Sequence, residues 1–142
     1  MPDIQHMIQI AAKPEAVYPL VSTAGGLAQW WAADIAPSDG AIDLGFFNRT
    51  TVYRLRLESD QPPTHAVWAC ESGQEWNGTR IAFRLEPRGA STALRFTHAG
   101  WAAPTEYFVS CNTTWGELMF RLKAAAEGKP RGPLFLANDM GY

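Results

Sequence analysis

The sequence predicts an α+β fold in which a curved antiparallel β-sheet wraps around one long C-terminal α-helix. Apolar residues recur every three or four positions between Pro104 and Gly128, which is the pattern of one helical face. From Gly40 the pattern changes to a two-residue alternation that is typical of half-buried strands. Because the only long helix must share the apolar face of this sheet, we expect the sheet to curl around it.

One strand and two short helices are expected first. Residues 4–10 alternate between apolar and polar side chains, with His6 on the apolar side, and therefore predict a strand. Residues 14–21 predict a short helix that Pro19 should kink or shorten, because proline lacks a backbone donor. Residues 27–31 predict one or two further helical turns that end in two tryptophans.

The sheet is completed by strands that alternate cleanly between covered and exposed side chains. They are expected at Ala41–Phe46, Thr51–Glu58, His65–Glu71, Thr79–Pro87 and Ser91–Ala99. The last two form a hairpin around Arg88-Gly89, in which residues 81, 83 and 85 match residues 94, 96 and 98 on the covered face.

The final helix is marked at both ends. Pro104 suits its first turn and Gly128 its end, while Glu117 and Arg121 are spaced for an i,i+4 ion pair. We therefore expect a single domain over residues 1–130. A tail, residues 131–142, contains an uncharged apolar stretch that we expect to dock over this domain or onto a second subunit, so a homodimer is one hypothesis.

The composition of the chain limits the kinds of binding partner that we expect. The chain has 142 residues, 46% of them hydrophobic and 18% charged, with a net charge of −2 and no block of like charges. This composition gives no reason to expect a nucleic acid or a membrane surface as partner. No apolar run approaches the roughly 18 residues of a membrane span, and MPDIQHMIQI does not resemble a signal peptide, so we expect a cytoplasmic protein.

Cofactor and metal signals are weak. The sequence has no phosphate-binding loop, dinucleotide fingerprint or HExxH helix, and we expect no cofactor. Cys70 and Cys111 lie on apolar stripes and are expected to be buried thiols. These two cysteines with His6 and His98 are an alternative zinc site, but none of the compact spacings of zinc sites is present, so no metal is predicted.

Several segments resemble the bacterial proteins related to the C-terminal domain of the Hsp90 ATPase activator, within the START-like, Bet v 1-like (SRPBCC) superfamily. They are Ala11 to Val17, Leu27 to Trp31, Trp68 with Cys70, Glu75 to Thr79, Thr92 to Trp101, and Cys111 with Trp115 and Leu118. The resemblance implies a helix-grip fold with a cavity between the sheet and the C-terminal helix. The better known relatives of this family bind lipids, hormones or polyketides, or act as polyketide cyclases. The sequence departs from the family pattern at Pro19 and in its tail.

The six tryptophans and seven phenylalanines suggest an aromatic wall for such a cavity. We expect the ligand-binding residues to be Trp31, Tyr53, Trp68, Phe83, Phe96, His98, Cys111 and Trp115. An inward His98 is either an acid, base or ligand anchor, or a core histidine that is bonded to a backbone carbonyl.

Three hypotheses of function follow. The first is binding of a small apolar or aromatic molecule, a lipid included, in the cavity. The second is an enzyme of the polyketide cyclase or hydratase type in the same cavity, with His98 and Tyr53 as the candidate acid and base. The third is a protein-interaction module that resembles a co-chaperone. The fold alone does not choose among them.

Overall fold

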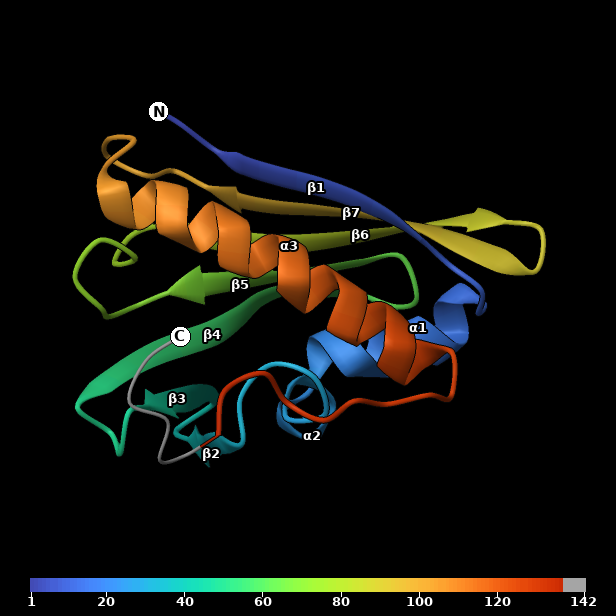
Figure 1. Ribbon diagram of the computed structural model, residues 1–142, viewed down its shortest axis with the longest axis horizontal. Helices are drawn as coiled ribbons and strands as arrows, with labels where there is room; N and C mark the ends of the chain where they lie inside the picture. The colour runs from blue at the N-terminus through green and yellow to red at the C-terminus, as the bar shows by residue number, and fades with distance from the viewer. Residues whose placement is uncertain (137–142) are drawn as a thin grey trace.

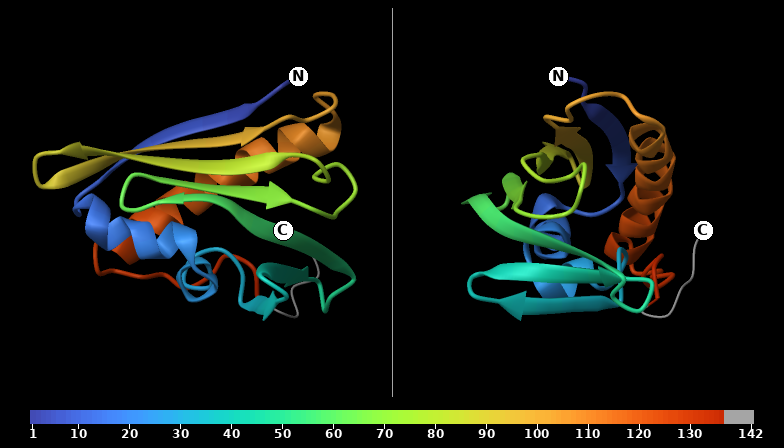
Figure 2. Two further views of the ribbon diagram at one scale, coloured as in Figure 1. Left: turned by 180° about the vertical axis from the view of Figure 1, so that it is seen from behind. Right: turned by 90° about the vertical axis from the view of Figure 1, so that its left-hand side faces the viewer.

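The computed structural model describes residues 1–136, which form a seven-stranded antiparallel sheet and three helices. The elements are β1 (Ile4–Ile10), α1 (Pro14–Ser22), α2 (Ala24–Leu27), β2 (Asp34–Ser38), β3 (Ala41–Phe46), β4 (Thr51–Gln61), β5 (His65–Cys70), β6 (Arg80–Arg88), β7 (Ser91–Ala99) and α3 (Glu106–Ala126). The strand order is β1-β7-β6-β5-β4-β3-β2. The sheet curves, and α3 runs along its concave side (Figures 1 and 2). The α+β helix-grip prediction is therefore confirmed.

The helix α3 begins slightly later than the sequence indicated. Thr105 is its N-cap, and the Thr105 hydroxyl accepts a hydrogen bond from the Phe108 backbone N–H. Pro104 thus precedes the helix instead of lying in its first turn. The expected ion pair is present, with 3.3 Å between Arg121 Nε and Glu117 Oε1.

Both expected short helices are present, and each differs from expectation in its bounds. The helix α1 continues past Pro19 to Ser22, because a proline in so short a helix removes only one intrahelical bond. The following α2 ends at Leu27, so Trp31 lies in a turn after it and not in a helix. The two helices cross closely at Gly26, where an added Cβ would lie 2.0 Å from the Pro19 carbonyl oxygen.

The strand β2 was missed by the sequence analysis. It lies at the edge of the sheet and contains Pro37, and an edge strand tolerates a proline that the alternation does not reveal. The strand β4 is also longer than predicted, because a register shift between Leu57 and Ser59 carries its pairing with β5 on to Gln61.

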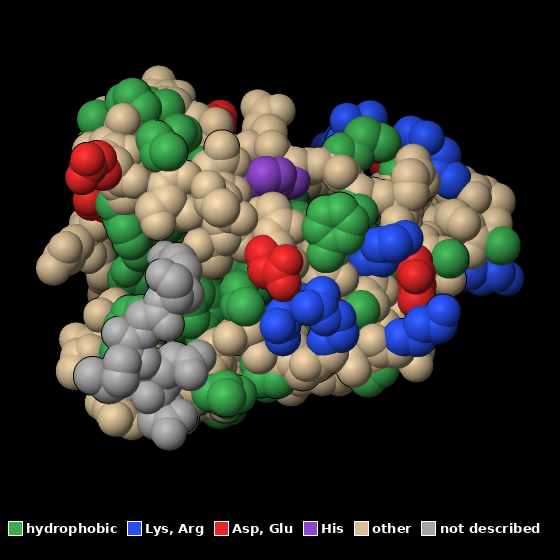
Figure 3. All heavy atoms as spheres, viewed as in Figure 1, with side chains coloured by type: hydrophobic (Ala, Val, Ile, Leu, Met, Phe, Trp, Pro, Cys, Tyr) green, Lys and Arg blue, Asp and Glu red, His purple; other side chains and the backbone are tan. Residues whose placement is uncertain are grey.

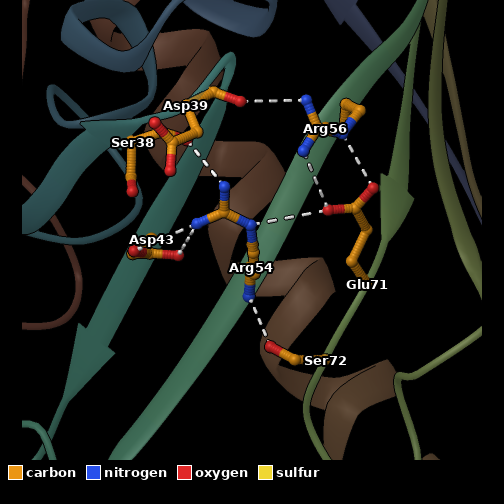
Figure 4. Close-up of polar contacts among 7 residues, drawn as sticks. All are labelled: Ser38, Asp39, Asp43, Arg54, Arg56, Glu71 and Ser72. Carbon is orange, nitrogen blue, oxygen red and sulfur yellow. Dashed lines mark hydrogen bonds and ion pairs between the residues drawn. The ribbon is translucent and has the colours of Figure 1, made fainter.

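A charged network on the outer face joins β3, β4 and β5 (Figure 4). Arg54 lies 3.2 Å from Asp43 and 3.5 Å from Glu71, and Arg56 lies 2.8 Å from the same Glu71 carboxylate. Arg54 also donates to the Ser38 carbonyl at the end of β2. The β2–β3 hairpin is therefore tied to the rest of the sheet from outside.

The C-terminal part of α3, Met119 to Ala126, which we call its second half, packs directly on the remainder of the fold. Leu122 is fully buried. Lys123 donates to the Gln9 carbonyl and Glu127 accepts from the Ala11 backbone N–H, at 2.6 and 2.7 Å. These bonds fix the end of the helix to the end of β1. No helix within residues 1–136 is long and apolar enough to cross a membrane.

Candidate ligand-binding site

A partly open cavity of about 390 Å³ lies between the first half of α3 and the β3–β4 hairpin. Its aromatic lining consists of Trp31, Phe46, Phe47, Tyr53, Trp76, Tyr107, Trp115 and Phe135. From α3 it is also lined by Cys111, Thr114 and Leu118, and none of its described lining residues comes from the second half of that helix. The volume falls within the usual range of small-molecule sites.

The two halves of α3 also differ on the surface. On the face drawn in Figure 3, Lys and Arg side chains gather toward the end where α3 finishes. Hydrophobic side chains gather toward the end where it begins and where the cavity lies.

Trp76 is the central ring of the cavity wall. Its indole stacks on Tyr53 at a centroid distance of 4.3 Å and an interplanar angle of 15°, and it lies 6.1 Å from Trp115 at 20°. Trp115 in turn contacts Trp31 at 5.0 Å. Offset and tilted rings of this kind are rigid and present flat apolar surface, which suits a flat apolar ligand.

Gly73 allows this stack to form. Its φ is +95°, and an added Cβ would lie 2.1 Å from the Tyr53 ring. Only glycine meets both conditions, so the loop after β5 can pass directly under the tyrosine.

One edge of the cavity is closed by the chain after α3. Phe135 is buried and meets Phe46 edge to face at 5.1 Å. Its backbone N–H donates to the Trp31 carbonyl, and its carbonyl accepts from the Ala33 N–H. The first part of the tail, residues 131–136, is thus docked beside the cavity, while residues 137–142 lie outside the described residues.

The polar side chains that line the cavity are those of Thr50, Thr51, Tyr53, Gln74, Tyr107, Cys111 and Thr114. The hydroxyl groups of Tyr53 and Tyr107 are hydrogen-bonded to each other. Burial, together with this bond, raises the pKa of Tyr107 far above its usual value, so its phenol stays protonated. Burial also raises the pKa of Cys111, although the Trp76 indole and the Tyr107 hydroxyl oppose that shift. Neither group is therefore a base or a thiolate nucleophile near neutral pH.

The described lining contains no lysine, arginine, histidine, aspartate or glutamate. Burial is the main cause of the raised pKa of Cys111, and the carboxylate of Glu75 adds the smallest contribution to it. Glu75 itself accepts a hydrogen bond from the Thr105 hydroxyl at the start of α3. Because an unpaired buried charge is strongly unfavourable, this lining favours uncharged ligands.

His98 is fully buried and does not line the cavity. Trp115 Nε1 donates to His98 Nδ1 at 3.2 Å, which leaves the proton on Nε2 for the hydroxyl oxygen of Thr79 at 2.8 Å. That hydroxyl donates to the Trp76 carbonyl. Burial lowers the pKa of His98 to about 3, so the ring is neutral.

His98 therefore corrects both interpretations drawn from the sequence. Its ring nitrogens are bonded to the side chains of Thr79 and Trp115 and not to a backbone carbonyl, and the ring does not line the cavity. Trp76 lies between it and Tyr53, with the His98 and Trp76 ring centroids 4.8 Å apart, so the proposed acid–base pair of Tyr53 and His98 is not formed.

The cavity lining coincides with the sequence-predicted set at Trp31, Tyr53, Cys111 and Trp115. The other four, Trp68, Phe83, Phe96 and His98, are buried in the closed core. Trp68 donates its indole N–H to the Val21 carbonyl of α1, because α1 covers the part of the sheet from which it points. Alternation identified inward side chains but not which of them α1 covers.

Trp76, Tyr107, Phe46 and Phe135 were not identified from the sequence as lining residues. Tyr107 belongs to the apolar helical pattern between Pro104 and Gly128, and its position one turn before Cys111 on the same helical face would have been the usable signal. Trp76 lies in a loop, where periodicity carries no information on direction.

The four residues of the alternative zinc site do not assemble. Within residues 1–136 no group of three or more His, Cys, Asp or Glu side chains is placed to hold a metal ion. His6 Nε2 lies 3.2 Å from the Asn112 carbonyl. Cys70 is a buried free thiol on β5, and burial raises its pKa to about 11.

Residues 11–127 match the family model described as activator of Hsp90 ATPase homolog 1-like protein. The chain belongs to this family. The match covers the region from the end of β1 to the end of α3 and thus includes most of the cavity wall. A comparison with curated proteins found no match.

Solved structures agree with this assignment. The solution structure of the Aha1 dimer from Colwellia psychrerythraea has a TM-score of 0.79 at 31% identity, over 91% of this chain and 98% of that one. The fold is also shared with SSP2350 from Staphylococcus saprophyticus, with a TM-score of 0.74, 14% identity and coverage of 96% and 99%. CalU16 from Micromonospora echinospora has a TM-score of 0.73 at 15% identity, over 93% and 69%. At such identities the last two establish the fold alone.

Proposed function

We propose that the protein binds a small, uncharged aromatic or apolar molecule in the cavity between α3 and the β3–β4 hairpin. The observation that carries the proposal is an aromatic-lined space of about 390 Å³ without a charged lining residue in the described chain. Burying flat apolar surface against rigid rings is favourable by roughly 25 cal/mol per Å².

The experiment is a thermal-shift screen with neutral aromatic compounds and lipids, followed by native mass spectrometry of the compounds that raise the melting temperature. We expect one-to-one complexes with neutral aromatic compounds. A protein that is not stabilised by any of them, and that carries no co-purifying small molecule, would contradict the proposal.

A matched pair of variants on α3 separates cavity binding from surface binding. Thr114 lines the cavity, whereas its neighbour Thr113 is exposed. Thr114→Trp should fill the cavity and abolish the thermal shift, while Thr113→Trp should leave the shift unchanged. Equal shifts in the two variants would place binding elsewhere.

The family description favours a second candidate, an interaction with an Hsp90 chaperone. Its test is a pull-down of a bacterial Hsp90 with the purified chain, with and without nucleotide. An enzyme of the cyclase or hydratase type has less support, because His98 is neutral, buried and engaged at both ring nitrogens.

We further propose that the protein is cytoplasmic. We also propose that it forms a homodimer, because the Colwellia relative is a dimer. Light scattering of the full chain and of a chain that ends at Pro130 tests the second point. A monomer in both cases would contradict the dimer, and loss of the dimer only in the shortened chain would assign it to the tail. Cell fractionation tests the location.

A further inference from the structure

The β3–β4 turn has a backbone conformation that residues other than glycine rarely adopt. Phe47, Asn48 and Arg49 have φ values of +53°, +54° and +63°, which lie in the left-handed region. A Cβ in this region crowds the following carbonyl oxygen, and of these three residues only asparagine tolerates it readily. Three such residues in succession are strained, so contacts elsewhere must hold the turn in this conformation.

An ion pair with β2 holds the turn in place. Arg49 Nε and Nη2 donate to the two carboxylate oxygens of Asp34, each at 2.9 Å. Asp34 is the first residue of β2 and is paired with Gly45 of β3. An arginine that binds both oxygens of a carboxylate is fixed in direction as well as in distance. The pair therefore fixes Arg49, the last of the three left-handed residues, to the neighbouring strand.

Gly45 leaves the room for this ion pair. An added Cβ at position 45 would lie 2.2 Å from Asp34 Oδ2 and 3.0 Å from Arg49 Cγ. The next residue of the strand, Phe46, lines the cavity, and successive strand residues point to opposite faces of a sheet. The ion pair thus lies on the outer face of β3, directly against its backbone, while the cavity lies on the inner face.

The strained turn carries Phe47 to the cavity wall. Phe47 lines the cavity, and its ring centroid lies 6.4 Å from that of Phe46. Its carbonyl oxygen accepts from the Thr50 backbone N–H at 3.2 Å and from the Thr50 hydroxyl at 2.9 Å. Side-chain direction follows the backbone conformation, so a turn that relaxed from the left-handed region would point the Phe47 ring elsewhere.

We propose that the Asp34–Arg49 ion pair is a latch that holds Phe47 against a ligand in the cavity. Asp34 and Arg49 are then positioning residues for binding, although neither is among the described lining residues. The inference rests on the proposed function, because it presupposes that the cavity takes a ligand. Strained residues concentrate at ligand clamps. Affinity falls in proportion to the fraction of molecules in which the turn has relaxed, and the latch keeps that fraction small.

The test compares two substitutions that both remove the ion pair and differ in backbone preference. Arg49→Ala keeps a Cβ in the left-handed region, whereas Arg49→Gly adopts a positive φ freely. Isothermal titration calorimetry uses 9-fluorenone, a flat and uncharged aromatic probe. Its dissociation constant should be about fivefold higher for Arg49→Ala than for Arg49→Gly. The original protein should bind at least as tightly as Arg49→Gly, and equal constants in the two variants would overturn the inference.

Ionic strength provides a readout that a merely structural role would not change. The probe is uncharged, so any difference in salt dependence between two variants arises within the protein. The Arg49 and Asp34 side chains are 45% and 22% exposed, so salt weakens their attraction. Between about 20 and 500 mM NaCl, the advantage of the original protein over Arg49→Gly should decrease by about twofold. An advantage that does not change with salt would contradict the latch.

Asp39 is the matched control. Its φ of +49° makes it the remaining left-handed residue other than glycine within residues 1–136, and it is not a described lining residue. Asp39→Ala and Asp39→Gly should both bind the probe as tightly as the original protein. If Asp39→Ala lost as much affinity as Arg49→Ala, general destabilisation would explain the effect and the inference would be wrong.

Failure of the two proposals is distinguishable. If neither 9-fluorenone nor any compound of the wider neutral screen binds the original protein, it is the proposed function that fails. If compounds bind with equal affinity to the original protein and to both Arg49 variants, the latch fails and cavity binding stands. Urea denaturation without a probe tests the strain itself, since Arg49→Gly should be more stable than Arg49→Ala. The opposite order would contradict a strained turn.

Discussion

The two halves of α3 carry the same amphipathic pattern and meet different surroundings. Leu118 ends the first half, is 1% exposed and lines the cavity. Leu122, one turn later, is 0% exposed and does not line the cavity. Burial is therefore the same for the two leucines, although one faces a space and the other faces a solid core. A buried helical stripe therefore shows which way the side chains point, but it does not show whether another part of the protein packs against them.

The difference arises from what stands opposite each half. The second half is fixed to β1 by the bonds of Lys123 and Glu127 and is close to α1. The first half faces the β3–β4 hairpin across the cavity. The hydroxyl of Tyr107 on α3 is hydrogen-bonded there to the hydroxyl of Tyr53 on β4. A sheet that curves away from a straight helix leaves space at one end only.

The variants Leu122→Ala and Leu118→Ala test most directly whether the two halves of α3 pack differently. We expect Leu122→Ala to lower the free energy of unfolding by about 3 kcal/mol, from lost transfer energy and a new void. Leu118→Ala should lower it by only about 2 kcal/mol, because its side chain already borders a space. Urea denaturation measures both values. Equal losses would mean that the two halves pack alike.

Gly73→Ala addresses the cavity half. A left-handed φ and a clash with the Tyr53 ring should together lower the free energy of unfolding by about 2 kcal/mol and weaken ligand binding. Gly89→Ala is the control, since Gly89 has a φ of +62° but no atom within 4 Å of an added Cβ. It should lower stability by about 1 kcal/mol and leave binding unchanged. Binding that is unaffected in Gly73→Ala would show that Tyr53 is not part of the site.

His98 sharpens the comparison through pH. Its pKa is about 3 in the folded protein and near 6.5 when unfolded, so the unfolded state binds the proton first. Stability that is complete above pH 6.5 should fall by about 1.4 kcal/mol per pH unit as the pH decreases toward 3. His98→Gln should reduce this slope, as measured by urea denaturation between about pH 4 and 7. Affinity for a neutral ligand should show no matching transition, because His98 does not line the cavity.

The outer network should give the smallest effect. Arg54→Met removes contacts to Asp43 and Glu71 that are partly solvent-exposed, so we expect the melting temperature to fall by only about 2 °C. Ligand affinity should also decrease, since the network holds the hairpin that walls the cavity. Arg80→Met removes a single, more exposed pair with Glu58 elsewhere on the sheet and should leave affinity unchanged. An equal change of affinity in both variants would show that the Arg54 network does not position the hairpin for ligand binding.

Much of the fold was predictable because its signals are periodic. The two-residue pattern located β3 to its bounds and placed Phe83 opposite Phe96, and the helical pattern located the buried face of α3. The missed strand β2 contains Pro37, which breaks the pattern without breaking an edge strand. The local sequence carries little information on β2, because this strand is defined by its pairing with β3 at the edge of the sheet.

The site was predictable only in part, for a different reason. Trp31 and Trp68 are equally buried aromatic residues, and only the path of α1 decides that Trp68 belongs to the closed core. Trp76 reaches the centre of the wall from a loop because Gly73 lets the chain pass beneath Tyr53. Both outcomes depend on contacts between distant segments, which periodicity does not encode.

The most direct measurement uses the six indole N–H resonances in a ¹H–¹⁵N spectrum during titration with 9-fluorenone. Trp31, Trp76 and Trp115 line the cavity, whereas Trp30, Trp68 and Trp101 lie in the closed core. We expect the first three signals to shift and saturate together while the other three stay in place. Saturating shifts of the core indoles alone, or no shift in any of the six, would contradict a binding cavity between the first half of α3 and the β3–β4 hairpin.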